Sequence, residues 1–155
     1  MIQDPGQFQI TLKLFLLRED QLLILEDRHD RVGDLPGGRI NQNEFFEPFH
    51  RTLAREVREE LGAVTYSINP DPVFCFQHFV QKDQKQALGL AFVGAWISGE
   101  ITLSEEHSGM DWVDCKTFSP GSRFVAHMLA AVERFQKDWV QFRDSLRANN
   151  TITLP

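Results

Sequence analysis

Residues 35–64 read LPGGRINQNEFFEPFHRTLAREVREELGAV, and the rest of the chain can be interpreted outward from this stretch. Its second half, 48–61, is predicted to form a helix, because Pro48 suits the first turn of a helix and Gly62 suits the residue that ends one. Apolar residues recur at i, i+4 and i+8, which gives the helix one apolar stripe for packing on a sheet. The residues of this stripe are Leu53, Val57 and Leu61.

The same helix carries an acidic cluster, with Glu56, Glu59 and Glu60 at i, i+3 and i+4. At about 100° per residue, these carboxylates share an arc of roughly 100° on the helix surface. Like charges this close repel unless a cation lies among them, and Mg²⁺ takes oxygen ligands of this kind. The alternative is a solvated helix face laced by i, i+4 pairs such as Arg55 with Glu59. The residues upstream of the helix favour the metal site.

A glycine pair, Gly37 and Gly38, follows Pro36 upstream of the helix. Two glycines let the backbone approach a ligand or a metal closely and expose a carbonyl that a side chain would obstruct. The glycine pair and the acidic helix together therefore favour a site in which a bound cation holds an anionic substrate.

These two features resemble the signature of the Nudix hydrolase family, which is Gly, five residues, Glu, seven residues, then Arg-Glu-apolar-x-Glu-Glu-x-Gly-apolar. The resemblance implies an α/β fold, a Nudix-type α/β/α sandwich with a mixed β-sheet between helices. It also implies metal-dependent cleavage of the pyrophosphate bond in a nucleoside diphosphate linked to another moiety, with nucleotide sugars and ADP-ribose as the leading classes. The matching residues are Gly38, Arg55, Glu56, Val57, Glu59, Glu60, Gly62 and Ala63, flanked by Leu35, Pro36 and Gly37.

The chain departs from the signature by an insertion. Residues 38–63 are 26 residues long, whereas the same part of the signature has 23. Glu44 keeps the five-residue spacing after the glycine, and Glu47 keeps the seven-residue spacing before Arg55. We favour Glu44 as the first glutamate of the signature, because Asn43 stands where the family has glycine and Asn tolerates positive φ. Glu47 stays open as the alternative.

The resemblance assigns roles to these positions. The metal, Mg²⁺ or Mn²⁺, would be bound by the Gly37 carbonyl and by the carboxylates of Glu56, Glu59 and Glu60. Arg55 would orient the glutamates through charged hydrogen bonds. The catalytic candidates are Arg55, Glu56, Glu59, Glu44 (or Glu47) and Glu106.

The segment 104–114, SEEHSGMDWVD, is where the family often supplies a further ligand or a general base, and Glu106 is the candidate for that role. Ordinary loop polarity is the alternative for each acidic residue in it. Arg28, Arg39 and Asp111 are candidates for binding the substrate, the two arginines through its phosphates. Aromatic candidates for stacking on a base or a ring are Phe45, Phe46 and Phe76.

Alternating apolar and polar residues predict strands in the rest of the chain. We expect two neighbouring strands at 7–17 and 21–28, and a hairpin of two strands within 72–99. A short strand is expected at 100–103. The segment 104–114 is expected to be a polar loop that leads into one more strand.

Helical spacing of apolar residues predicts a long amphipathic helix at about 122–147, packed on the sheet and also a candidate contact of a homodimer. The tail, 149–155, is expected to be frayed. The length of 155 residues corresponds to a single domain, 1–155, with a core of about 7–147.

Composition limits the function classes. The 42% hydrophobic and 25% charged content is typical of a soluble globular protein, and the net charge of −6 argues against a broad nucleic-acid-binding surface. A small anionic nucleotide remains a suitable substrate if metal ions supply the positive charge. The N-terminal residues lack the pattern of a signal peptide, and no apolar run is long enough to cross a membrane, so we expect a cytoplasmic protein.

Three hypotheses stay open. The first is a metal-dependent diphosphohydrolase. The second is a catalytically silent Nudix-like module that binds nucleotides for regulation, although the intact REVREEL run counts against it. The third is isomerisation of an isoprenoid diphosphate, which needs a positioned cysteine. Cys75 and Cys115 match no metal or redox spacing, so we expect both to be reduced and structural.

Overall fold

The computed structural model describes residues 3–148 and 150–155 and is built on one mixed β-sheet of eight strands. The strand order is β3-β2-β1-β6-β4-β8, with β5 paired to β6 and β7 paired to β2. The strands are β1 (Gln9–Arg18), β2 (Gln21–Asp27), β3 (Gly33–Asp34), β4 (Val64–Ile68), β5 (Phe74–Val80), β6 (Lys85–Gly99), β7 (His107–Asp114) and β8 (Ile152–Leu154). Met1, Ile2 and Asn149 lie outside the described residues.

The centre of the sheet is a parallel pair, β1 with β6, in register from Gln9 opposite Ala87 to Leu17 opposite Ala95. The predicted neighbouring strands β1 and β2 pair antiparallel, as do β5 and β6 of the predicted hairpin. Parallel and antiparallel pairs therefore coexist, which confirms the mixed sheet.

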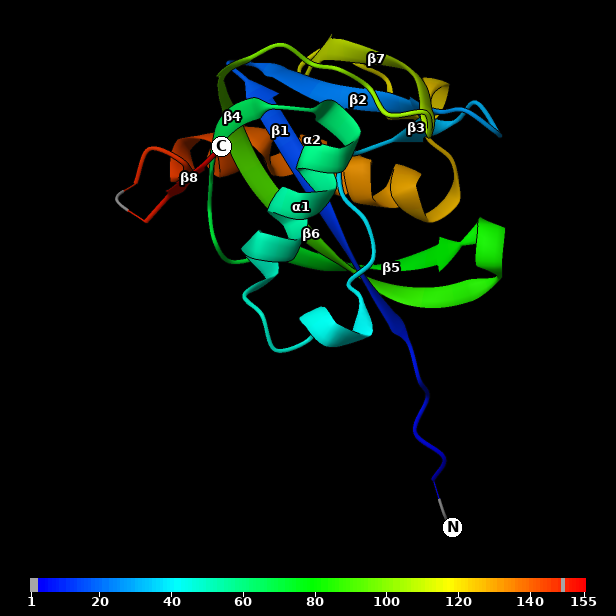
Figure 1. The fold of residues 1–155 in the computed structure, drawn as a ribbon. Helices are drawn as coiled ribbons and strands as arrows, with labels where there is room; N and C mark the ends of the chain where they lie inside the picture. The colour runs from blue at the N-terminus through cyan, green and yellow to red at the C-terminus, as the bar shows by residue number, and fades with distance from the viewer. Residues whose placement is uncertain (1–2, 149) are drawn as a thin grey trace.

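Two helices cover opposite faces of this sheet (Figure 1), α1 (Phe49–Leu61) and α2 (Ala126–Ser145). The predicted stripe of α1 is buried in a cluster with Leu12, Leu14 and Leu16 of β1. Phe15 and Leu17, which alternate with those leucines, lie in a second cluster with α2. Residues alternate between faces along a strand, so one strand serves both cores. The predicted α/β/α sandwich is thus confirmed.

Helix α1 matches its prediction within one residue. Pro48 is the N-cap rather than the first helical residue. At the other end, the Gly62 N–H donates to the Arg58 carbonyl at 3.0 Å, and Gly62 has a φ of 77°, which a residue with a side chain rarely adopts. The glycine therefore ends the helix where the sequence indicated.

Two predicted connections have different structures. The short strand expected at 100–103 is wrong, because these residues form no strand. The polar loop expected at 104–114 is wrong over most of its length, because β7 occupies His107–Asp114 and pairs with β2. Gly, Ser and Asp give this segment a low strand propensity, and the backbone hydrogen bonds offered by the edge of β2 override it.

The C-terminal part also differs from its prediction. Helix α2 begins at Ala126 rather than 122, because residues 120–122 form a 3₁₀ turn and Val125 is the N-cap. The expectation of a frayed tail is wrong for 152–154, which form the edge strand β8 and pair with β4. The unpaired backbone groups along β4 offer hydrogen bonds to any extended segment, which explains why the tail forms a strand there.

None of the helices within residues 3–148 and 150–155 has the length and apolar character needed to span a bilayer. Both cysteines are free thiols; Cys115 is buried and Cys75 is exposed on β5.

Candidate active site

The glycine pair runs beside the central strand β1. The Leu12 N–H donates to the Gly38 carbonyl and the Leu14 N–H to the Pro36 carbonyl, both at 2.8 Å. Gly37 has a φ of +128°, and a Cβ there would lie 2.1 Å from the Leu12 carbonyl oxygen. Only glycine can therefore bring the chain this close to β1 at position 37.

The second glycine makes room for a carboxylate. A Cβ on Gly38 would lie 2.5 Å from both Cδ and Oε2 of Glu56, which reaches down from α1. The two glycines are thus required for different reasons. Strand β1 leaves no space for a side chain at position 37, and the Glu56 carboxylate of α1 occupies the space at position 38.

Glu60 is the most buried member of the acidic cluster, with 6% of its surface exposed. Its Oε2 accepts a hydrogen bond from the Gly37 N–H at 2.7 Å. Burial raises the pKa of Glu60 to about 7, although Lys13 and the Gly37 N–H oppose the shift. Burial also raises the pKa of Glu56, against the opposing effect of Arg55. Both carboxylates therefore lie where negative charge is poorly solvated and a cation would be favourable.

Arg55 organises the exposed side of the cluster. Its Nε donates to Glu44 Oε1 at 2.7 Å and its Nη2 to Glu44 Oε2 at 3.0 Å, a bidentate pair. It also contacts Glu56 at 2.9 Å and Glu59 at 3.2 Å. Hydrogen bonding to Arg55 lowers the pKa of Glu44. Glu47 instead pairs with Arg51 at 3.2 Å on the surface.

A second ionic network lies beneath the glycines, and sequence reasoning missed it. Lys13 of β1, 6% exposed, donates through Nζ to Asp34 Oδ1 at 2.7 Å and to the carbonyls of Leu35 at 3.1 Å and Gly37 at 3.4 Å. Burial alone would lower the pKa of Lys13, but the carboxylates of Asp34 and Glu60 raise it. His107 Nε2 lies 3.9 Å from Asp34 Oδ2. The available signal was Lys13 itself, a charged residue between the leucines at 12 and 14 of β1.

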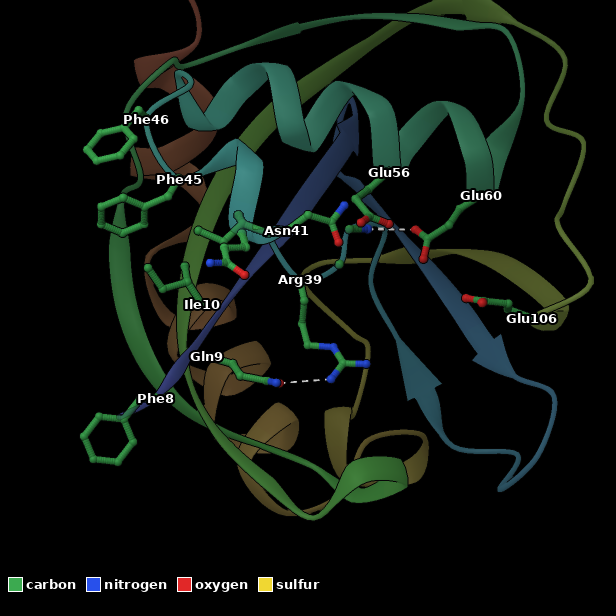
Figure 2. Close-up of a pocket in the computed structure, with 14 residues that line it drawn as sticks. Phe8, Gln9, Ile10, Arg39, Asn41, Phe45, Phe46, Glu56, Glu60 and Glu106 are labelled. Carbon is green, nitrogen blue, oxygen red and sulfur yellow. Dashed lines mark hydrogen bonds between the residues drawn. The ribbon is translucent and has the colours of Figure 1, made fainter. Parts of the chain in front are cut away.

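The acidic cluster opens into a pocket of about 850 Å³. Figure 2 shows Glu56, Glu60 and Glu106 at one end of it and Arg39 in its middle. Phenylalanines line the opposite end. The remaining lining residues are Gln9, Ile10, Gly37, Gly38, Ile40, Asn41 and Gln42, with Phe8, Phe45 and Phe46.

The structure brings some of the predicted site residues to this pocket and leaves others outside its lining. Gly37, Arg39, Glu56, Glu60 and Glu106 line it. The residues outside the lining have other neighbours: the Glu59 side chain is 58% exposed beside Arg55, Arg28 Nη2 donates to the His107 carbonyl at 3.5 Å, and Asp111 pairs with Arg123 at 3.3 Å. Cys75 and Phe76 are also outside it.

The acidic end fits a divalent cation in part. Among residues 3–148 and 150–155, no three acidic, histidine or cysteine side chains are already grouped at metal-binding spacing. Two carboxylates with raised pKa values, the partly buried Glu56 and the buried Glu60, nevertheless face the pocket next to the glycine backbone. Glu59 would have to leave Arg55 to join them. Oxygen donors of this kind suit Mg²⁺ or Mn²⁺.

Comparison with known proteins identifies the fold. No family model matches the sequence, and no curated protein matches it either. Among solved structures, a MutT protein from Methanosarcina mazei Go1 is 22% identical over 89% of this chain and 98% of its own, with a TM-score of 0.66. An Ap4A hydrolase from C. elegans is 16% identical over 86% of this chain and 99% of its own, with a TM-score of 0.69. A UDP-X diphosphatase is 11% identical over 96% of this chain and 68% of its own, with a TM-score of 0.67.

The chain therefore has the Nudix hydrolase fold, as the signature in residues 38–63 indicated. At these identities the likeness concerns the fold, and the function has to be argued from the site.

Proposed function

We propose that this protein is a Nudix hydrolase that cleaves the pyrophosphate bond of a nucleoside diphosphate linked to another moiety, of the nucleotide-sugar or ADP-ribose type. The observation that carries the proposal is the placement of Glu56 and Glu60. Glu60 is buried and Glu56 is partly buried beside the glycine pair at one end of the pocket, and burial raises the pKa of each. Such a site favours a cation, and a cation there favours a diphosphate.

The proposed cofactor is Mg²⁺ or Mn²⁺, held by Glu56 and Glu60, by Glu59 once it leaves Arg55, and by the Gly37 carbonyl. When bound, the cation would neutralise the diphosphate and polarise its phosphorus–oxygen bonds. The Gly37 carbonyl already accepts a hydrogen bond from Lys13 at 3.4 Å, so this ligand would be shared between the ammonium and the metal.

The chain's own residues would position the reacting groups. Glu44 fixes the guanidinium of Arg55 by two hydrogen bonds, and Arg55 in turn fixes the carboxylate of Glu56. Arg39 lies in the middle of the pocket, where it could contact a phosphate of a substrate that extends from one end of the pocket to the other. Glu106 lies at the acidic end and is the proposed general base.

The structural neighbours support this substrate class. The names of two of them refer to nucleotide substrates, Ap4A and UDP-X, which contain phosphate anhydrides. The pocket of about 850 Å³ is within the size range typical of small-molecule sites. A homodimer contact through α2 and a cytoplasmic location remain predictions. Sedimentation of the purified protein would test the first, and fractionation of cells the second.

The test is a panel of nucleotide sugars, ADP-ribose and dinucleoside polyphosphates, assayed with Mg²⁺ and with Mn²⁺. We expect turnover, and we expect Glu60→Gln and Glu59→Gln each to lower kcat/KM by about 100-fold, because each removes a negative ligand. Glu133→Gln, on the exposed face of α2, is the matched control and should retain full activity. If both site variants remain fully active, the metal assignment is wrong.

A second candidate function is binding without catalysis. It is favoured by the pairing of Glu59 with Arg55, which leaves the acidic cluster incomplete among the described residues. This candidate predicts that nucleotides bind, as measured by calorimetry, and that none is hydrolysed with either metal.

A further inference from the structure

The exposed aromatic side chains of the described residues all line one pocket, with Phe45 and Phe46 adjacent and Phe8 set apart from them (Figure 2). Phe8 is 62% exposed, Phe45 53% and Phe46 96%, and all three line the pocket at the end away from the carboxylates (Figure 2). The other large hydrophobic side chains that are exposed in residues 3–148 and 150–155 are aliphatic. Leaving three phenyl rings in water forgoes the free energy of burying them, so their grouping at one pocket indicates a ligand that covers them.

Two of these rings come from the inserted residues. Glu44 is fixed by Arg55, so the extra residues relative to the Nudix signature follow it, between the 3₁₀ turn η1 (Gln42–Glu44) and helix α1. Phe45 and Phe46 are the first residues of this segment. Their rings meet edge to face, with centroids 5.2 Å apart and planes at 83°. The feature therefore belongs to this chain's departure from the signature.

The wall between the rings and the carboxylates is polar but mostly uncharged. Gln9, Asn41 and Gln42 contribute amide side chains to it. Arg39 is fixed there, because its Nη1 contacts Gln9 Oε1 at 2.9 Å and Asp83 Oδ2 at 2.5 Å. Amides donate and accept hydrogen bonds in one plane, which suits the edge of a heterocyclic ring.

We propose that the aromatic end of this pocket binds the base of the substrate, with the face of the base on Phe45 and its edge near the amides of Gln9 and Asn41. This assignment rests on the proposed function, because the diphosphate at Glu56 and Glu60 sets the position of the base. Base–aromatic stacking tolerates different bases, so the site selects for the presence of a base more than for its identity. The insertion then makes the enzyme prefer nucleotides to base-free diphosphates.

Other occupants of the aromatic end fit less well. An anionic membrane surface would need a cluster of cations, whereas the chain has a net charge of −6 and the pocket is lined by three carboxylates and one arginine. A second copy of the chain would need a broad complementary face, whereas these rings border a pocket that continues to the acidic end.

The experiment compares two substrates and three proteins. The substrates are ADP-ribose and a base-free diphosphate ester, methyl diphosphate. The proteins are the wild type, Phe45→Ala/Phe46→Ala, and the control Ile97→Ala/Val140→Ala, which removes exposed hydrophobic side chains that do not line the pocket. We expect the wild type to prefer ADP-ribose. The phenylalanine variant should lose about tenfold in kcat/KM for ADP-ribose, mainly through KM, and less than about twofold for methyl diphosphate. The control should match the wild type.

A binding measurement separates this proposal from the proposed function. In protein with ¹³C-labelled phenylalanine, adenosine should shift the ring signals of Phe45 and Phe46 whether or not any substrate is hydrolysed. If substrate is hydrolysed and the phenylalanine variant has the same substrate preference as the wild type, the aromatic subsite is refuted and the proposed hydrolase function stands. If adenosine shifts the ring signals but no substrate is hydrolysed, the subsite stands and the hydrolase function is refuted. Loss of a dimer in the variant, seen by sedimentation, or loss of its binding to phosphatidylserine vesicles would overturn the subsite in favour of that occupant.

Discussion

Two ionic networks lie on opposite sides of the glycine pair and differ in their exposure. Arg55 of helix α1 joins Glu56 and Glu59 of the same helix to Glu44 of the turn η1, and its side chain is 32% exposed. Lys13 joins Asp34 beneath the glycines, and its side chain is 8% exposed. Water reaches Arg55 but hardly reaches Lys13, although the Asp34 side chain is 25% exposed, so the cation of each network is screened to a different degree. We expect the exposed network to control activity and the buried one to control stability.

The largest effect is expected from the buried network. Lys13→Met would leave the Asp34 carboxylate without its cation and should lower the free energy of unfolding by about 3–5 kcal/mol. Urea denaturation followed by circular dichroism measures this change, with the m-value checked for constancy.

The control for this prediction is a double variant. Lys13→Met with Asp34→Asn removes both charges, and Asn keeps an acceptor for the Leu35 N–H, which donates to Asp34 at 2.7 Å. The double variant should recover most of the lost stability. A loss below about 1 kcal/mol for Lys13→Met alone would show that the pair is not effectively buried.

Next in size is the pH dependence conferred by Glu60, which lies between the two networks. Its pKa is about 7 in the folded protein against 4.5 for the ordinary group. Between these values the folded state binds more protons than the unfolded state, so stability falls as pH rises. The decrease attributable to Glu60 should reach about 3 kcal/mol by pH 7 in metal-free protein.

The measurement is urea denaturation in EDTA at several pH values from 4.5 to 8, on wild type and on Glu60→Gln. Glu60→Gln should show a flatter profile, and the difference between the two proteins isolates this residue from Glu56, whose pKa is also raised. If the free energy of unfolding changes with pH equally in both proteins, ionisation of Glu60 does not destabilise the folded state. Adding Mg²⁺ should reduce the slope of the wild type, because a bound cation favours the charged carboxylate.

The two networks also differ in how far the sequence predicts them. Helix α1 and its acidic face follow from local periodicity, and the match to the Nudix signature predicts the sandwich around them. Glu59 pairs with Arg55 at i, i+4, as the solvated-face alternative describes. These relations lie within one helix, where spacing determines which side chains meet.

The buried network depends on contacts that local spacing does not show. Lys13 and Asp34 are 21 residues apart, and strand alternation alone would have turned Lys13 to solvent. Local spacing does not predict strand β7 for a related reason, because the residues of its partner β2 lie 80 to 93 positions earlier and its own composition is polar. The aromatic end of the pocket combines Phe8 with the insertion, and only the folded chain brings these segments together.

The smallest effect on stability is expected in the exposed network of Arg55. Variants there test which glutamate, Glu44 or Glu47, is the functional partner of Arg55. Glu44→Ala should cost less than about 1 kcal/mol of stability, since Arg55 keeps its contacts with Glu56 and Glu59. It should nevertheless lower kcat/KM by about 10–100-fold, because Arg55 loses its bidentate partner and Glu56 its fixed orientation.

Glu47→Ala is the matched variant four residues from Arg51, and it should change neither the stability nor kcat/KM, because that pair is on the surface. The two variants, compared by steady-state kinetics and urea denaturation, would reverse in order if Glu47 were the first glutamate of the signature. Equal effects on kcat/KM would instead show that the position of Arg55 does not limit the reaction, and the distinction between the two networks would then rest on stability alone.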